Sequence, residues 1–269
     1  MTRHSPLAWA PPLLLMAAAL TIHLADLNRE IFLLLNRDLS RMLPPRMWEM
    51  ITLLGDGGVV LALLLPFCRR HPRFVLTALT AGILAGLAAQ LLKYGFDLPR
   101  PPGVLDARTI NIIGPGYSRH SFPSGHTTTL FALLGSFIMV VGVAGRRHLF
   151  IALPLTATAL LAALSRSVVG VHWPTDILTG AAIGWLCAYG AWRLLPQGDP
   201  GVAAQRWLEG FLAFCAVYLL FFHDTGYADA VRLQHALAFG ALALACLERI
   251  PKIVRIYGDA SPQDPPPAR

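Results

Sequence analysis

Eight apolar runs, each close to the length needed to cross a lipid bilayer, constrain this chain more than any other feature. A spanning helix needs about 20 mostly apolar residues. Because lipid offers no hydrogen bonds to the backbone, such runs fold as helices, and the sequence predicts an all-α, polytopic membrane helical bundle. The runs are Ala8–Leu24, Met47–Cys68, Phe74–Leu92, Thr127–Gly145, Leu149–Leu164, Ile177–Leu195, Trp207–Phe222 and Leu233–Leu247.

Charge is too scarce for a soluble protein of this size. Of the 269 residues, 55% are hydrophobic and 14% are charged, whereas soluble domains are about one quarter charged. The mean hydropathy is +0.55. These values exclude disordered, collagen-like and disulfide-framework proteins. The net charge of +7 comes from basic residues scattered between the apolar runs, so we predict no nucleic-acid partner.

Shorter features fit the same interpretation. We interpret the first run as an uncleaved span, because a signal peptide usually begins with a positively charged region and only Arg3 precedes this run. Ile31–Leu35 is too short to cross and predicts an interfacial helix. The Pro-rich end, Ser261–Arg269, predicts disorder. No pair of cysteines has the spacing of a metal or redox motif, which predicts packing roles for Cys68, Cys187, Cys215 and Cys246.

The distribution of Lys and Arg predicts the orientation. With the N-terminus in the cytoplasm, a moderate excess of basic residues lies on the cytoplasmic side. We therefore predict a bacterial inner-membrane protein whose loops after the third and fifth runs face the periplasm. The cytoplasmic basic residues are then Arg3, Arg69, Arg70, Arg73, Arg146, Arg147, Arg193, Arg206, Arg249, Lys252, Arg255 and Arg269.

Three polar segments interrupt the apolar pattern. They are KYGFDLPRP at Lys93–Pro101, FPSGH at Phe122–His126 and SRSVVGVHWPTD at Ser165–Asp176. The first closes the third run, the second opens the fourth, and the last joins the fifth to the sixth. Because successive spans alternate in direction, we expect all three segments at one membrane face.

The residue types in these segments indicate an oxyanion site. Arg100 and Arg166 have planar guanidinium groups that match phosphate oxygens, and Lys93 adds a point charge. Pro123 suits the first position of a helix. The following N–H groups would then face an anion at the helix N-terminus, and they belong to Ser124, Gly125 and His126.

Two histidines and a carboxylate add nucleophilic chemistry. Pro174 suits a helix start, so Asp176 falls in the first turn of that helix and can orient the ring of His172. The free ring nitrogen of His172 can then attack phosphorus. His126, at the start of another helix, can protonate the leaving oxygen and later activate water.

These three segments resemble the signature of the type 2 phosphatidic acid phosphatase superfamily, with all three parts present and in order. The resemblance implies a metal-independent phosphohydrolase with a phosphohistidine on His172, supported by Asp176, and with His126 as general acid. It implies no cofactor. Soluble haloperoxidases share the signature, but the apolar runs argue against them here. The implied phosphate contacts are Lys93, Arg100, Ser124, Gly125 and Arg166.

The resemblance covers about six spans and divides the chain. We expect a phosphatase-like core at 1–196, two additional transmembrane helices at 197–255 and a Pro-rich tail at 256–269. The expected substrate is a lipid phosphomonoester or diphosphate, because a site at helix ends can meet a headgroup whose tails stay in the bilayer. Candidates are phosphatidic acid, phosphatidylglycerophosphate, undecaprenyl diphosphate and lipid A phosphates.

Several alternatives stay open at this point. A phosphotransferase would share the first chemical step, with a second lipid as acceptor in place of water. A transporter or a non-catalytic scaffold is the remote alternative, favoured by the acidic residue Asp56 inside a span. Arg119 and His120 lie close enough to FPSGH to touch a headgroup. Nothing in the sequence indicates the oligomeric state.

Overall fold

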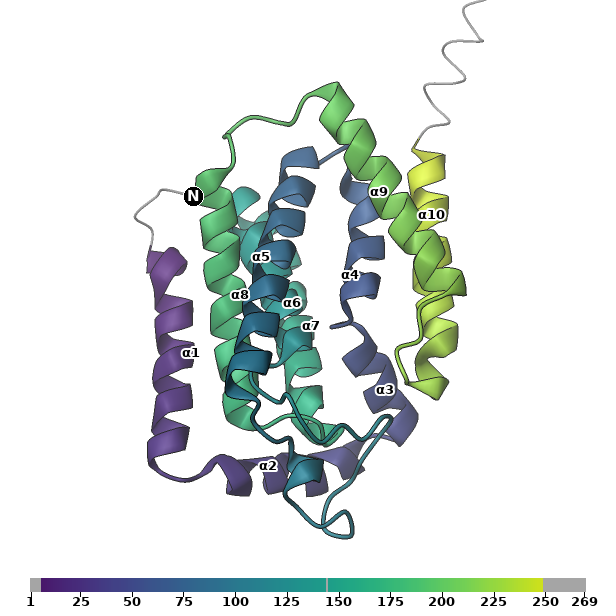
Figure 1. Cartoon of the computed structure of the whole chain (residues 1–269). Helices are drawn as coiled ribbons and strands as arrows, with labels where there is room; N and C mark the ends of the chain where they lie inside the picture. The colour runs from purple at the N-terminus through teal and green to yellow at the C-terminus, as the bar shows by residue number, and fades with distance from the viewer. Residues whose placement is uncertain (1–5, 144, 249–269) are drawn as a thin grey trace, which may run out of the picture.

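The computed structural model describes residues 6–143 and 145–248, and within them the chain forms ten α-helices and no strand (Figure 1). The predicted all-α fold is confirmed. The predicted disordered tail and the basic residues from Arg249 onward lie outside the described residues. The helices are α1 (Pro6–Leu24), α2 (Asn28–Arg37), α3 (Pro45–Leu53), α4 (Gly57–Leu64), α5 (Pro72–Phe96), α6 (Gly125–Val140), α7 (Arg146–Val168), α8 (Pro174–Leu194), α9 (Val202–Phe221) and α10 (Val231–Leu247).

The chain is an integral membrane protein, although its spans are less uniform than the eight runs predict. Among the described residues, four helices are long and apolar enough to cross a membrane, and the number rises to six if each of two bent helix pairs is one span. One bent pair is α3 with α4, and the bend of 57° between them interrupts the second predicted run. Helix α6 has only 16 residues. It packs against α5, α7 and α8, so protein covers much of its surface in place of lipid.

Helices α6 and α8 form the centre of the bundle, and glycines allow them to approach closely. A Cβ atom added at Gly184 would lie 2.2 Å from the Thr128 carbonyl oxygen, and one at Gly180 would lie 2.7 Å from the Ser124 carbonyl oxygen. Small residues at helix interfaces in membranes permit such contact. The starts of α6 and α8 are thereby held side by side.

Helix α2 lies across one end of the bundle, at the bottom of Figure 1, and meets α1 at an angle of 103°. It contains the run that predicts an interfacial helix. Its buried Asn36 side chain donates to the carbonyl oxygens of Asn111 and Val168, at 2.8 and 2.9 Å. These bonds tie α2 to the loop after α5 and to the end of α7.

Two helices beyond residue 197 form a hairpin that packs on α4 (Figure 1). Leu212 and Leu219 of α9 are fully buried in a cluster with Val59 of α4. At one end of the hairpin, Arg69 pairs with Glu209 at 2.8 Å. At the other end lies the short 3₁₀ helix η4 (Ala228–Ala230).

Candidate active site

The three polar segments meet at the end of the bundle that carries α2, at the bottom of Figure 1. Lys93 lies in the last turn of α5, and Arg100 follows in the loop after it. His126 lies in the first turn of α6, and Arg166 in the last turn of α7. His172 is placed just before α8. The predicted meeting of these segments is confirmed.

His172 is oriented by the start of α8. Pro174 is the first residue of this helix, as predicted, and Asp176 occupies its third position. The Nδ1 atom of His172 lies 3.3 Å from Oδ2 of Asp176. The same oxygen accepts hydrogen bonds from the Trp173 N–H at 2.9 Å and from the Ser121 hydroxyl at 2.5 Å. Two hydrogen bonds that do not involve His172 therefore hold the Asp176 carboxylate in position.

Ser121 is a site residue that the sequence interpretation missed. The available signal is its position immediately before the FPSGH segment. Its hydroxyl and its backbone are fully buried. A serine beside a motif is common in turns, so the sequence alone does not distinguish it from a loop residue.

The second nitrogen of the His172 ring faces a cation. Nε2 lies 3.3 Å from Nη1 of Arg100. Because a guanidinium can only donate and a carboxylate can only accept, the two contacts together assign the proton to Nδ1 and the lone pair to Nε2. His172 is 2% exposed, and this burial, followed by the charges of Arg100, Arg166 and Lys93, lowers its pKa well below 6.5. The ring is neutral at pH 7.

Arg100 and Lys93 also hold the loop that covers the site. The Nε atom of Arg100 donates to the Arg119 carbonyl oxygen at 2.9 Å, and Nη1 donates to that of Val171 at 3.2 Å. Lys93 Nζ donates to the His120 carbonyl oxygen at 3.0 Å. Much of the Arg100 fork, which the sequence interpretation assigned to phosphate, is therefore occupied by carbonyl groups.

The start of α6 differs in one respect from the sequence interpretation. Helix α6 begins at Gly125 with Ser124 as its N-cap, so Pro123 is not the first helical residue. The Ser124 N–H donates to the Asp176 carbonyl oxygen at 3.0 Å. It is therefore not free for an anion, because α8 approaches too closely. The N–H groups of Gly125 and His126, in the first turn of α6, have no partner within the helix.

The remaining polar candidates have structural partners. Asp56 caps α4, accepting from the N–H groups of Gly58 and Val59, and pairs with His223 Nε2 at 3.1 Å. This accounts for the acidic residue that favoured transport. The side chains of Arg119 and His120 both pair with Asp97.

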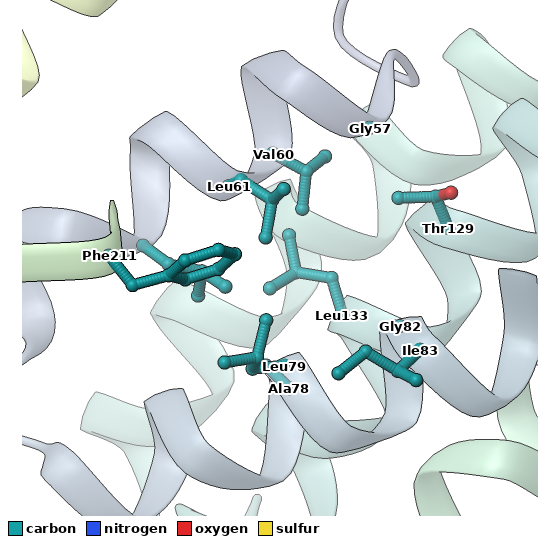
Figure 2. A pocket seen from close by; sticks show the side chains of 11 residues that line it. Gly57, Val60, Leu61, Ala78, Leu79, Gly82, Ile83, Thr129, Leu133 and Phe211 are labelled. Atoms are coloured by element: carbon teal, nitrogen blue, oxygen red, sulfur yellow. The ribbon is translucent and has the colours of Figure 1, made fainter. Parts of the chain in front are cut away.

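An apolar pocket opens beside the site, between α4, α5, α6 and α9 (Figure 2). Its volume is about 210 Å³. Thr129 lies at one end, one helical turn after His126, and Phe211 lies at the opposite end (Figure 2). The lining between them is aliphatic: Val60, Leu61, Leu64, Ala78, Leu79, Ile83 and Leu133.

Within residues 6–143 and 145–248, no three His, Cys, Asp or Glu side chains gather into a group that could hold a metal ion. The four cysteines are free. The fold and the site together define a polytopic helical membrane protein with a buried site of two histidines, a carboxylate and three cations at one end of the bundle.

Comparison with known proteins finds a similarity over the middle of the chain. Residues 74–198 match the model of the PAP2 superfamily. The range includes all three polar segments and helices α5 to α8.

Three relatives with similar sequences are all named lipid A 1-phosphatase. The lipid A 1-phosphatase of Rhizobium etli is 33% identical over 135 residues, which are 45% of this chain and 54% of the relative. The lipid A 1-phosphatase of Porphyromonas gingivalis is 33% identical over 94 residues, or 35% of this chain and 18% of the relative. The chain thus spans about half the length of the Rhizobium relatives it matches.

Two solved structures share the fold. Aquifex aeolicus LpxE aligns with a TM-score of 0.54 and 28% identity, covering 62% of this chain and 95% of that chain. The PAP2-type phosphatidylglycerolphosphate phosphatase of Bacillus subtilis aligns with a TM-score of 0.50 and 21% identity, covering 70% and 94%.

Proposed function

We propose that this chain is a membrane lipid phosphatase that hydrolyses a lipid phosphomonoester or diphosphate through a phosphohistidine on His172. One observation carries the proposal. The Nε2 lone pair of a neutral His172 points to Arg100, while Asp176 holds the opposite nitrogen. This is the arrangement of an activated nucleophile with its orienting carboxylate.

The chemistry proceeds in two steps. Nε2 attacks phosphorus and forms a P–N bond, the bond from phosphorus to the lipid oxygen breaks, and His126 donates a proton to that oxygen. His126 then takes a proton from water, whose oxygen attacks phosphorus and releases inorganic phosphate from His172. Lys93, Arg100, Arg166 and the N–H groups at the start of α6 offset the charge of the phosphoryl group. No metal is needed in this scheme.

A lipid substrate is supported by the apolar pocket. It begins one helical turn from His126 and is lined by aliphatic side chains, which suits hydrocarbon and not a sugar or peptide. Relatives from two bacterial genera are named lipid A 1-phosphatases. We therefore infer that the 1-phosphate of lipid A is the first substrate to test, ahead of phosphatidic acid, phosphatidylglycerophosphate and undecaprenyl diphosphate.

The location of the site follows from the charge distribution. We propose an inner-membrane protein with its active site on the periplasmic face, because the topology predicted from the sequence puts 12 of the 22 Lys and Arg residues on the opposite side. We also propose that 1–196 form the phosphatase core and that 197–255 form an added helical unit.

The test uses the purified full chain in detergent with a panel of the four lipid phosphates and EDTA present. We expect inorganic phosphate to be released from at least one of them and orthovanadate, which resembles the five-coordinate transition state, to inhibit. Phosphate that appears on a second lipid without release would indicate a phosphotransferase. Activity that is lost with EDTA and restored by Mg²⁺ would contradict the metal-free scheme.

A further inference from the structure

One nitrogen of the Arg166 guanidinium donates hydrogen bonds to two hydroxyl groups. Arg166 is 3% exposed, and its Nη1 atom lies 2.5 Å from the Thr52 hydroxyl and 2.9 Å from the Tyr227 hydroxyl. Among the described residues, its Nε–H has no hydrogen-bond partner. A buried donor without a partner is costly, so a ligand that accepts from Nε would relieve it.

Tyr227 comes from outside the part of the chain that matches the family. It lies between α9 and η4, 61 residues after Arg166, whereas the family match ends at residue 198. Its ring lies 6.0 Å below the Arg166 guanidinium carbon. Tyr227 is therefore an addition to the phosphate site made by the C-terminal hairpin.

The surroundings of Tyr227 fix its position. The side chain is 2% exposed. Gly114, in the loop over the site, has a φ of +78°, and a Cβ atom there would lie 2.4 Å from the ring. On the other side, the Asp229 N–H donates to the Glu49 carboxylate on α3 at 2.8 Å. The contact with Gly114 and the anchored 3₁₀ turn together hold the Tyr227 hydroxyl beside Arg166.

We propose that Tyr227 is a positioning residue for phosphate binding: its hydroxyl and ring orient Arg166 so that the Nε edge of the guanidinium faces the phosphoryl group. This rests on the proposed function, because it assigns phosphate to the pocket. A planar fork binds two oxygens only at the correct angle, so an Arg166 free to rotate would bind phosphate less tightly.

The test compares Tyr227→Phe with Tyr218→Phe, a matched removal of a hydroxyl from an exposed tyrosine of the same hairpin. Orthovanadate affinity is measured from the thermal stabilisation of the purified full chain, alongside kcat and KM on a soluble phosphate ester. We expect Tyr227→Phe to weaken orthovanadate binding roughly tenfold, the range of one hydrogen bond to a charged group. Tyr218→Phe should bind as the wild type does.

A second comparison separates positioning from general support of the fold. In an Arg166→Lys background, Tyr227→Phe should cause no further loss of orthovanadate affinity, because the group that it orients is gone. Unchanged affinity in Tyr227→Phe, or an equal loss in the Arg166→Lys background, would overturn the inference while leaving the phosphatase proposal intact. A wild-type chain that binds no orthovanadate would overturn both. If Tyr227→Phe does not fold, Thr52→Val removes the other hydroxyl on Nη1, and unchanged affinity there would likewise overturn the inference.

Discussion

At the scale of single residues, the proposed chemistry depends on which ring nitrogen of His172 carries the lone pair. The Asp176 carboxylate contacts the protonated Nδ1 atom of His172. Asp176 in turn accepts hydrogen bonds from the Ser121 hydroxyl and from the Trp173 N–H. The Ser121 contact joins two segments of the chain that are 55 residues apart. In the proposed mechanism, the nucleophile is thus oriented by residues that take no part in bond breaking.

His172→Ala is expected to abolish phosphate release, because no other described side chain stands in its position. Asp176→Asn should lower kcat by about 10²- to 10⁴-fold, since the ring loses its orienting carboxylate. The measurement is phosphate release by purified variants of equal melting temperature. His71→Ala, an exposed histidine at the opposite end of the bundle, is the control. Activity of His172→Ala above a few per cent would exclude the phosphohistidine.

The stability of the protein should depend on pH through His172. Its pKa in the folded protein is lowered well below 6.5 by burial and by Arg100, Arg166 and Lys93. Below pH 6.5 the unfolded chain binds a proton that the folded chain does not, so acidification favours unfolding by up to about 1.4 kcal/mol per pH unit.

Glutamine at position 172 does not titrate and provides the reference. The melting temperature of the wild type minus that of His172→Gln should fall as the pH is lowered from 7 to 5. The difference between the two proteins isolates the effect of the residue at position 172. A difference that does not change with pH would show that His172 keeps its ordinary pKa in the folded state.

At the scale of helices, the site is assembled by the contact between α6 and α8. One helix carries His126 and the other carries Asp176. The Ser124 N–H of one donates to the Asp176 carbonyl of the other. The distance between the two helices therefore sets the distance between His126 and Asp176.

Gly184→Ala is expected to lower stability by about 1–3 kcal/mol, the usual range for overpacking, and to lower activity. The added Cβ atom would lie 2.2 Å from the Thr128 carbonyl and 2.8 Å from the Ala132 nitrogen, both backbone atoms that cannot yield locally. Gly190→Ala on the same helix meets nothing within 4 Å and is the matched control. Equal melting temperatures and activities of the two variants would contradict the role of this contact.

At the scale of the whole molecule, the hairpin α9–α10 is attached at both ends of the bundle. Arg69 and Glu209 pair at one end, and Asp56 and His223 pair at the other. The end with His223 and Tyr227 is also the end with the active site. The added unit thus contacts Arg166 through Tyr227 and lines the apolar pocket through Phe211.

The sidedness of the molecule decides which leaflet supplies the substrate. With the native cysteines replaced, a cysteine at the exposed Asp106 should react with a membrane-impermeant maleimide in intact spheroplasts. A cysteine at the exposed His71 should react only after lysis. The reverse pattern would place the active site in the cytoplasm and remove the periplasmic lipid phosphates from the candidates.

The helical bundle, the meeting of three polar segments and the start of α8 at Pro174 could all be predicted from the sequence. These follow from patterns within one stretch of chain: apolar length sets a span, alternation of spans sets the face, and proline sets a helix start. Even there the prediction for α6 was wrong by two residues, because its start depends on contact with α8.

The contacts between distant residues could not be predicted from the sequence. Ser121 reaches Asp176 across 55 residues, Tyr227 reaches Arg166 across 61, and His223 reaches Asp56 across 167. Serine, tyrosine and histidine have many uses in a membrane protein, so their types predict no particular partner. Which of them meet is set by how the helices pack, and that is the sum of many weak contacts that no local pattern records.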